Sequence, residues 1–210
     1  MKTLVVAGGN PADWPLLTDF EYYVGIDRGA WYLLEQGLPL NLAVGDFDSL
    51  NEVERKRVFD AAGEVQRSHP EKDDTDTQLG LSAVFTGDPL AQVTLIGATG
   101  GRLDHFLANL WLGLEPRFQP FLRQIRLADR QNSLTYYGPG SYEIQQEPGM
   151  KYLAYCCLTP VRDLTLTKSK YLLERQQVLV PTSYASNEFV TDTAGFSFSE
   201  GVIAVVQSRD

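Results

Sequence analysis

The sequence has few of the residues that build zinc sites and disulfide frameworks. Among its 210 residues there are two cysteines, Cys156 and Cys157, and two histidines, His69 and His105. Adjacent cysteines rarely bridge each other, and two cannot form a disulfide framework, so we interpret them as core residues of an intracellular protein. No C-x-x-C or H-E-x-x-H pattern occurs, which excludes the common zinc motifs.

Positive charge is also scarce, and long hydrophobic runs are missing. The chain has 18 lysines and arginines against 27 aspartates and glutamates, which gives a net charge of −9. Such a charge disfavours a nucleic acid or an anionic membrane as partner, although a bound divalent cation can still allow a small anionic ligand.

The opening stretch MKTLVVAGGN is too short in its apolar part for a signal peptide or a membrane span, and no other segment is long enough. We therefore expect a cytoplasmic protein.

Familiar catalytic motifs are missing as well. No G-x-x-x-x-G-K-[ST] occurs, and no G-x-G-x-x-G follows a strand-like run, which excludes the P-loop and the common dinucleotide-binding fingerprint. A Ser-His-Asp triad with His69 or His105 has little support, because neither has a G-x-S-x-G partner.

The pattern of apolar and turn-forming residues changes near residue 124. Before that point, short apolar runs typical of buried strands alternate with helix-like segments, which predicts a parallel sheet covered on both faces. After it, segments rich in Tyr, Val, Leu and Thr are separated by Gly and Pro, which is typical of antiparallel strands. Hydrophobic residues make up 43% of the chain, enough for a real core. We predict an α/β fold, with an N-terminal three-layer domain over 1–124 and a C-terminal antiparallel β domain over 125–210.

Aspartates gather beyond the predicted strands, where ligands of parallel sheets bind. Asp46 and Asp48 follow one apolar run directly. They could simply complement a helix dipole, or they could be a pair of Mg²⁺ ligands, and both explanations stay open. Asp73, Asp74 and Asp76 crowd the start of another predicted helix. Three aspartates in four positions exceed what capping needs, so we expect at least one to serve a metal or a substrate hydroxyl.

Capping-box spacing predicts where the helices after these aspartates begin. Ser49 with Glu52 marks one start, and Thr75 with Gln78 marks the other. Both boxes place an aspartate-rich turn directly before a helix.

The stretch GATGGRLDHFLANLWLGL, 97–114, joins a glycine-rich turn to an amphipathic helix. A Gly-Gly turn leading into a helix can present backbone N–H groups to phosphate oxygens. Arg102, His105 and Asn109 share one face of the helix, with Asp104 at its flank. A lone histidine is more often structural and a lone arginine an exposed charge, so either role remains open here. The apolar residues form a second stripe, which we expect to pack on the sheet: Leu103, Phe106, Leu107 and Leu110.

Four pieces of the sequence carry a resemblance to a known family. They are VGDFDS, KDDTDTQL, GGRLDHFLANL and SYASNEF, spread in this order over positions 44 to 189. Each piece is moderately specific, and together they resemble the thiamine pyrophosphokinase family. That family pairs an N-terminal α/β domain with a C-terminal β-sandwich. It transfers pyrophosphate from ATP to the thiamine hydroxyl and gives thiamine diphosphate and AMP.

The resemblance implies a thiamine diphosphokinase that uses ATP as co-substrate and Mg²⁺ as cofactor. The implied catalytic residues are Asp46, Asp48, Asp73, Asp76 and Asp104. The implied metal ligands are Asp46, Asp48 and Asp73. The implied ATP contacts are Asp27, Asp46, Asp73, Arg102, Asp104 and His105. The implied thiamine contacts are Gln78, Ser186 and Asn187.

The family is dimeric, so the resemblance also implies a homodimer. Residues 1–124 would form the nucleotide- and Mg²⁺-binding catalytic domain, and residues 125–210 the thiamine-binding and dimerisation domain. Tyr184 and Phe189 flank the Ser-Asn-Glu motif and are candidates for aromatic walls around the cationic thiazolium ring. Ordinary β-core packing is the other interpretation of both.

The chain departs from the family at one turn. The family tends to carry Asp-Gly-Gly after its second strand, where this sequence has Asp27-Arg28-Gly29. The aspartate matches and the middle glycine does not. Arg28 could reach a phosphate, or it could replace a small residue at a tolerant turn.

Two other functions remain as alternatives. Asp46 and Asp48 fit superficially the Asp-x-Asp of haloacid-dehalogenase-like phosphatases, in which the first aspartate is the nucleophile. The chain could also be a nucleotide- or thiamine-sensing module that binds both ligands without catalysis. The phosphatase reading leaves the other motifs unexplained, and a sensor has no need of an aspartate that activates a hydroxyl.

Overall fold

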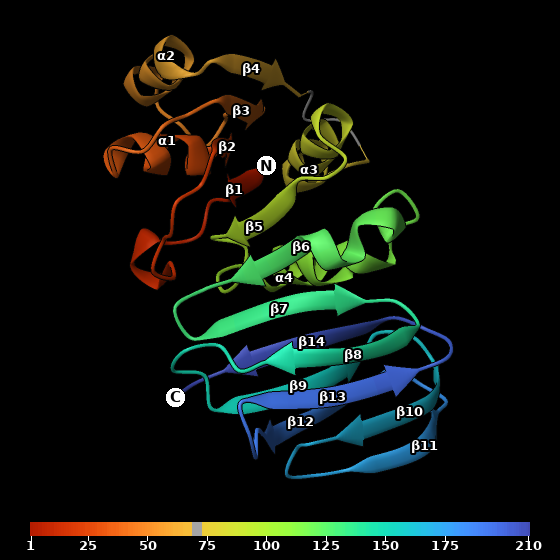
Figure 1. The fold of residues 1–210 in the computed structure, drawn as a ribbon. Helices are drawn as coiled ribbons and strands as arrows, with labels where there is room; N and C mark the ends of the chain where they lie inside the picture. The colour runs from red at the N-terminus through yellow and green to blue at the C-terminus, as the bar shows by residue number, and fades with distance from the viewer. Residues whose placement is uncertain (69–72) are drawn as a thin grey trace. The chain divides into compact units, whose positions relative to one another are not determined.

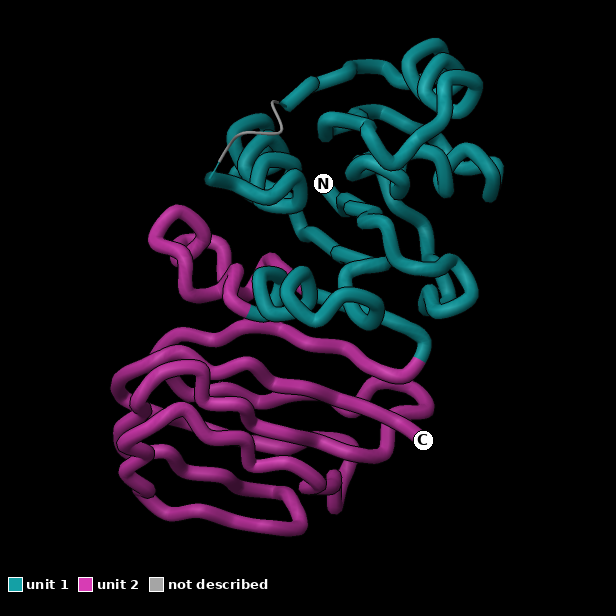
Figure 2. Tube along the Cα trace, turned by 180° about the vertical axis from the view of Figure 1, so that it is seen from behind, with its two compact units in different colours: residues 1–110, 127–130 teal, residues 111–126, 131–210 magenta. Residues whose placement is uncertain are grey.

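The computed structural model describes residues 1–68 and 73–210, and the chain divides into two compact units, coloured separately in Figure 2. Unit 1 consists of residues 1–110 and 127–130. Unit 2 consists of residues 111–126 and 131–210. Among the described residues, none of the helices has the length and hydropathy that a membrane crossing requires.

The sheet of unit 1 is parallel. Its strands are β1 (Lys2–Val6), β2 (Tyr22–Ile26), β3 (Leu42–Gly45), β4 (Glu64–Arg67) and β5 (Gln92–Ile96), labelled in Figure 1. They lie in the order β5-β1-β2-β3-β4, and each neighbouring pair is parallel. The chain extends the sheet in one direction from β1 to β4 and then returns to the other side of β1. Beyond the carboxyl ends of β1 and β5 the strand order therefore reverses, which is where open parallel sheets bind their ligands.

Helices cover both faces of this sheet. They are α1 (Arg28–Glu35), α2 (Glu52–Ala61), α3 (Asp76–Gly87) and α4 (Leu103–Leu110), with the short 3-10 helix η1 (Pro11–Asp13) after β1. Successive side chains of a strand point to opposite faces. In β2, Gly25 faces α1, because a Cβ there would collide with Ala30. Ile26 faces α3, because a Cβ on Gly80 would collide with its Cδ1. Helices α1 and α3 thus lie on opposite faces, which confirms the predicted three-layer arrangement.

The start of α3 is as predicted. The Thr75 hydroxyl accepts a hydrogen bond from the Gln78 N–H (3.3 Å), and the Gln78 Oε1 accepts one from the Thr75 N–H (2.6 Å). This is the capping box that the spacing indicated.

The predicted start of α2 is wrong. The N-cap is Asn51, whose Oδ1 accepts from the Glu54 N–H (2.9 Å), while the Glu54 Oε2 accepts from the Asn51 N–H (3.0 Å). A tight turn, closed by the Leu50 N–H on the Phe47 carbonyl (3.2 Å), occupies the positions before it. Phe47 is fully buried and packs edge to face on Phe59. Its burial fixes this turn, so the helix begins two residues later than Ser49 and Glu52 predicted.

The predicted apolar stripe of α4 is wrong at its first residue. Leu103 is 69% exposed, and residues 101–105 are exposed throughout. The first turn of this eight-residue helix thus lies outside the core. Asn109, in contrast, is buried and donates a hydrogen bond from its Nδ2 to the Ala98 carbonyl (2.9 Å).

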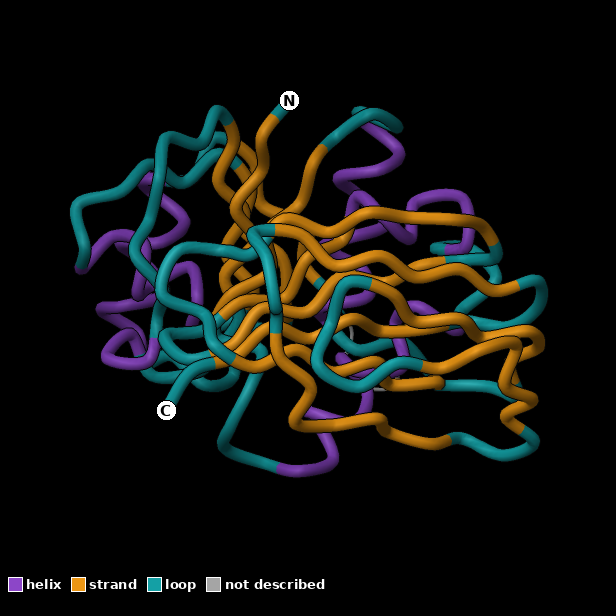
Figure 3. The backbone as a smooth tube through the Cα atoms, turned by 60° about the horizontal axis from the view of Figure 1, so that its bottom comes forward, coloured by secondary structure: helices purple, strands orange, loops and turns teal. Residues whose placement is uncertain are grey.

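Unit 2 is an antiparallel β-sandwich, as predicted, and Figure 3 shows its strands in orange. The strands are β7 (Asn132–Tyr137), β8 (Gly140–Gln145), β9 (Tyr152–Cys157), β10 (Val161–Thr167), β11 (Leu173–Val178), β12 (Thr182–Glu188), β13 (Thr193–Phe198) and β14 (Ile203–Ser208). One layer has the order β12-β9-β14-β7 and the other β11-β10-β13-β8. Tyr155 and Phe196 come from different layers and pack together in the core between them.

The chain passes between the units through short segments. Unit 2 begins with the 3-10 helices η2 (Trp111–Leu114) and η3 (Gln119–Gln124). Strand β6 (Ile125–Ala128) starts in unit 2 and ends in unit 1, so Asp129 and Arg130 belong to unit 1.

We expect Gly25→Ala to destabilise the protein by about 1–3 kcal/mol, because the added methyl would press β2 off the backbone of α1. Gly87→Ala is the matched control, since a Cβ there meets nothing within 4 Å, and its effect should stay within about 1 kcal/mol. Urea unfolding monitored by circular dichroism measures both. Equal stabilities of the two variants would contradict the close packing of α1 on β2.

Candidate functional site

One hollow of unit 1 lies at the carboxyl edge of the parallel sheet. It is reached by the turns after β1, β2, β3 and β5 and by the start of α3. Its charged and titratable lining residues are Asp27, Asp48, Asp76, Arg28, Arg102 and His105. The sequence had singled out each of these positions, and the fold brings them together because parallel strands end at the same edge.

Two glycine turns form the part of the hollow nearest to the reversal of strand order. The Gly9 N–H donates to the Gly97 carbonyl (2.9 Å), and a Cβ on Gly9 would lie 2.5 Å from that oxygen. Gly100 and Gly101 have φ of +73° and +64°, which disfavours any residue with a side chain. The main chain is therefore bare where a phosphate group would approach it.

Two side chains tie the glycine-rich turn, residues 97–101, in place. Asn109 of α4 donates to the Ala98 carbonyl, and the Thr99 hydroxyl donates to the Asp129 Oδ2 (2.7 Å). Asp129 was missed by the sequence reasoning. The available signal was its place directly after β6, because Asp27 and Asp46 likewise come directly after β2 and β3.

Asp27 is held against the end of β3. Its Oδ1 accepts a hydrogen bond from the Phe47 N–H (3.1 Å), and a Cβ on Gly45 would collide with that oxygen. Its backbone has φ 45° and ψ −116°, a conformation that costs a non-glycine residue on the order of 1–3 kcal/mol. Strain of this kind persists only where the surroundings enforce it, and it is concentrated at functional sites.

The carboxylates near Asp27 repel one another. Burial, followed by the charge of Asp76, raises the pKa of Asp27 to about 7. The charge of Asp46 and a hydrogen bond shared with Asp76 act in the same direction, and the Phe47 N–H opposes them. Asp76 also accepts a hydrogen bond from the Ser68 hydroxyl (2.7 Å). The Asp27 carboxyl thus lies close enough to Asp46 and Asp76 to feel the charge of both.

The two other predicted metal ligands, Asp48 and Asp73, differ in where they lie. Asp48 lines the hollow, and its N–H donates to the Asp46 Oδ1 (3.0 Å). Asp73 lies exposed in the turn before α3. Within the part of the chain that the structure describes, no three or more His, Cys, Asp or Glu side chains are grouped as a ready metal site. His69, considered above for a triad, lies outside the described residues.

Arg102 and Asp104 form an exposed ion pair at the start of α4. The guanidinium donates from Nε and Nη2 to the two carboxylate oxygens of Asp104, at 3.1 and 2.6 Å. The hydrogen bonds from Arg102 hold the pKa of Asp104 below its usual range. Of the two, Arg102 is the one that lines the hollow, together with His105.

Of the residues implied in thiamine binding, Gln78 belongs to unit 1, where it takes part in the capping box of α3, and Ser186 and Asn187 belong to unit 2. Asn187 is 2% exposed and uses its whole amide. Its Oδ1 accepts from the N–H groups of Tyr171 and Glu188, and its Nδ2 donates to the Tyr171 carbonyl and the Ser169 hydroxyl. Ser186 is exposed with φ +59°, at an irregularity in the pairing of β12 with β9. Tyr184 and Phe189 pack against the core of unit 2, which supports the core interpretation of both rings.

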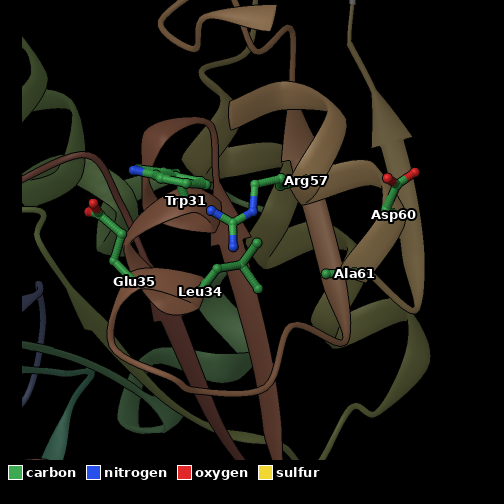
Figure 4. Close-up of a pocket in the computed structure, with 6 residues that line it drawn as sticks. All are labelled: Trp31, Leu34, Glu35, Arg57, Asp60 and Ala61. Carbon is green, nitrogen blue, oxygen red and sulfur yellow. The ribbon is translucent and has the colours of Figure 1, made fainter. Parts of the chain in front are cut away.

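A second hollow lies between α1 and α2 (Figure 4). The Arg57 guanidinium lies over the Trp31 ring there, 5.5 Å from its centroid. The lining also includes Glu35 and Asp60. None of the residues that the sequence analysis assigned to a site belongs to it.

Asp27→Asn should stabilise the protein relative to wild type at pH 8 but much less at pH 4. The pKa of Asp27 is raised in the fold, so the stability that its neutral form supports is complete below about pH 4 and is lost as the pH rises to about 7. Thermal unfolding at several pH values measures this difference. Asp88→Asn is an opposite-sign control, because hydrogen bonds from the Leu90 N–H and the N-terminus lower the pKa of Asp88. A pH-independent difference for Asp27→Asn would contradict the coupling of the carboxyls.

Comparison with known proteins identifies the family. The chain matches "Thiamin pyrophosphokinase, catalytic domain" over residues 14–122 and "Thiamin pyrophosphokinase, vitamin B1 binding domain" over residues 141–203. The thiamine pyrophosphokinase of Bacillus subtilis (strain 168) is 34% identical over 220 residues, which cover both chains completely.

Two solved structures agree. A thiamin pyrophosphokinase family protein from Enterococcus faecalis is 59% identical with a TM-score of 0.98, and the thiamine pyrophosphokinase of Bacillus subtilis is 32% identical with a TM-score of 0.85. Each match covers 100% of both chains. The phosphatase and sensor alternatives find no support in these matches. Because the relatives match along their whole length and the two family domains together span most of the sequence, the chain belongs to the thiamine pyrophosphokinase family.

Proposed function

We propose that this chain transfers the pyrophosphoryl group of ATP to the hydroxyl of thiamine, giving thiamine diphosphate and AMP. The observation that carries the proposal is the hollow of unit 1, in which bare glycine turns lie beside a group of coupled carboxylates. The glycine turns suit phosphate oxygens, and the carboxylates suit a divalent cation that accompanies them.

The phosphate chain of ATP would lie along the glycine-rich turn. Backbone N–H groups there would approach its oxygens, and Arg102 would add a forked cationic contact. Arg102 is bound to Asp104 in this structure and is exposed, so it can exchange that partner for a phosphate. The other ATP contacts would be Asp27, Asp46, Asp73, Asp104 and His105.

The donor set of the hollow fits Mg²⁺, which prefers oxygen ligands and uses one or two carboxylates together with substrate phosphates. Burial and the nearby charges of Asp76 and Asp46 raise the pKa of Asp27 to about 7, and a divalent cation would offset the crowding of these carboxylates. We propose Asp46, Asp48 and Asp73 as the ligands, with Asp27 and Asp76 beside them. When bound, the ion would neutralise charge on the phosphate oxygens.

The reaction would be an in-line displacement. The thiamine hydroxyl oxygen would form a bond to the β-phosphorus of ATP, the bond from that phosphorus to the α–β bridging oxygen would break, and AMP would leave with the bonding electrons. The hydroxyl proton needs an acceptor, for which the candidates are Asp73, Asp76 and Asp104. Asp76 lines the hollow, whereas Asp104 is held by Arg102, so the contacts favour Asp76.

The remaining parts of the proposal concern thiamine and assembly. We propose that Gln78, Ser186 and Asn187 contribute to the thiamine pocket, that residues 1–124 bind ATP and Mg²⁺, and that residues 125–210 bind thiamine and form a homodimer. Asn187 would act by shaping the 169–171 segment, since its amide is already fully hydrogen-bonded. A cytoplasmic location is part of the same proposal.

The protein incubated with ATP, Mg²⁺ and thiamine should form thiamine diphosphate and AMP in equal amounts, and EDTA should stop the reaction. Chromatographic separation of the products measures both. Inorganic phosphate released without thiamine, or a trapped aspartyl-phosphate on Asp46, would contradict the proposal and favour the phosphatase.

Asp46→Asn and Asp73→Asn should each reduce turnover by at least about a hundredfold and leave the circular dichroism spectrum unchanged, because each removes a negative charge from the proposed metal site. Asp60→Asn on the exposed side of α2 serves as the matched control and should keep full activity. Near-normal turnover in either site variant removes that residue from the proposed ligands.

A further inference from the structure

Arg28 connects the end of β2 to the turn after β3. It is the first residue of α1, and its Nη2 donates hydrogen bonds to the Ser49 carbonyl and to the Glu54 Oε2 (3.3 Å). Its side chain is 32% exposed and that of Glu54 is 18% exposed, so the ion pair is partly shielded from water. Arg28 also lines the hollow that holds the candidate site.

The residue next to Arg28 fastens the same segment of chain. Asp27 accepts the Phe47 N–H, while Arg28 donates to the Ser49 carbonyl. The acidic turn, residues 46–49, is therefore held at two points by two consecutive residues. Asp48 lies between these two points.

The contact with Glu54 extends this connection to the start of α2. The Glu54 Oε2 that meets Arg28 also accepts the Asn51 N–H in the capping box. The box fixes the first turn of the helix directly after the acidic turn. Arg28 thus contacts Ser49 at the end of the acidic turn and Glu54 in the first turn of α2.

The charges of the site explain why such a connection is needed. Asp46 and Asp48 lie near Asp27 and Asp76, and like charges at short range push the acidic turn away from the sheet edge. A guanidinium stays protonated at any ordinary pH, and its hydrogen bonds to a carboxylate are stronger than neutral ones. Arg28 therefore supplies a permanent opposing force in the absence of a metal ion.

We propose that Arg28 is a positioning residue, which holds the acidic turn against the end of β2 so that Asp46 and Asp48 are in place before Mg²⁺ and ATP bind. This role differs from the two considered for Arg28 from the sequence, which were a contact to phosphate and a tolerated replacement of the glycine that the family tends to have there. The inference rests on the proposed function for its kinetic consequence, but the fastening of the turn can be measured without substrates.

Hydrogen exchange of the substrate-free protein tests the fastening directly. Three amides report on this fastening: the Phe47 N–H donates to Asp27, the Leu50 N–H donates to the Phe47 carbonyl, and the Asn51 N–H donates to Glu54. In Arg28→Met they should exchange about tenfold faster, since a charge-assisted hydrogen bond has been removed. Peptides from β1 and β5 should not change. Arg57→Met, the same substitution at an arginine whose guanidinium lies over Trp31 in the hollow between α1 and α2, is the matched control and should leave the exchange of these three amides at the wild-type rate.

Kinetics tests the consequence for the site. Arg28→Met should raise the Mg²⁺ concentration for half-maximal turnover by about tenfold and leave the KM for thiamine unchanged. Arg28→Lys should recover part of the loss, because a single ammonium can keep one of the two contacts. Glu54→Gln keeps an acceptor for Asn51 but loses the ion pair, and combining it with Arg28→Met should add little further loss.

Each other outcome is decisive. Wild-type exchange rates in Arg28→Met would overturn the proposal. A raised KM for ATP with an unchanged Mg²⁺ requirement would also overturn it, because that result would mean that Arg28 contacts the nucleotide directly. If Arg28→Met fails to fold, Arg28→Lys and Glu54→Gln carry the same two measurements. If wild type forms no thiamine diphosphate, the proposed function fails, while the exchange rates still decide whether Arg28 fastens the turn.

Discussion

Mutual repulsion of carboxylates at one edge of a parallel sheet is the constraint on which the rest of unit 1 depends. Asp27 adopts an unfavourable backbone conformation beside Asp76 and Asp46. Burial, followed by the charge of Asp76, raises its pKa to about 7. A fold keeps such an arrangement only if surrounding contacts enforce it. The enforcing contacts here come from the Phe47 N–H, the Ser68 hydroxyl and the Arg28 guanidinium.

Tight packing of the sheet against its helices offsets the free-energy cost of the strained Asp27 backbone and the repelling carboxylates. Gly25 lets α1 approach β2 and Gly80 lets α3 approach the opposite face, so the strand ends are fixed from both sides. Gly45 leaves just enough room for the Asp27 carboxylate at the end of β3. The small residues of these elements therefore serve the site indirectly, since they set where the carboxylates lie.

The glycine-rich turn provides the complementary half of the site. It exposes main chain where the strand order reverses, and Asn109 and Asp129 hold it from two directions. Carboxylates on one side and bare N–H groups on the other suit a ligand that carries both a divalent cation and phosphate oxygens. Membership of the thiamine pyrophosphokinase family, matched along the whole chain, agrees with that chemistry.

The sequence by itself determined the features that depend on neighbouring residues. Apolar runs and turn residues predicted a parallel sheet followed by antiparallel strands, and the spacing of Thr75 and Gln78 predicted a capping box that is present. Aspartates after apolar runs predicted a site at strand ends, because chain direction in a parallel sheet brings those ends together.

Only the tertiary structure decided the features that depend on contacts between distant residues. Ser49 with Glu52 and Asn51 with Glu54 have the same spacing, and the burial of Phe47 against Phe59 selects the second pair. The exposure of Leu103 and the hydrogen bond from Arg28 to Ser49 likewise have no local signal. The place of Asp129 directly after a strand marks it as a candidate site residue but does not predict that Thr99 is its partner. The physical reason is that burial and long-range hydrogen bonds are set by the packing of whole elements, which local sequence periodicity does not encode.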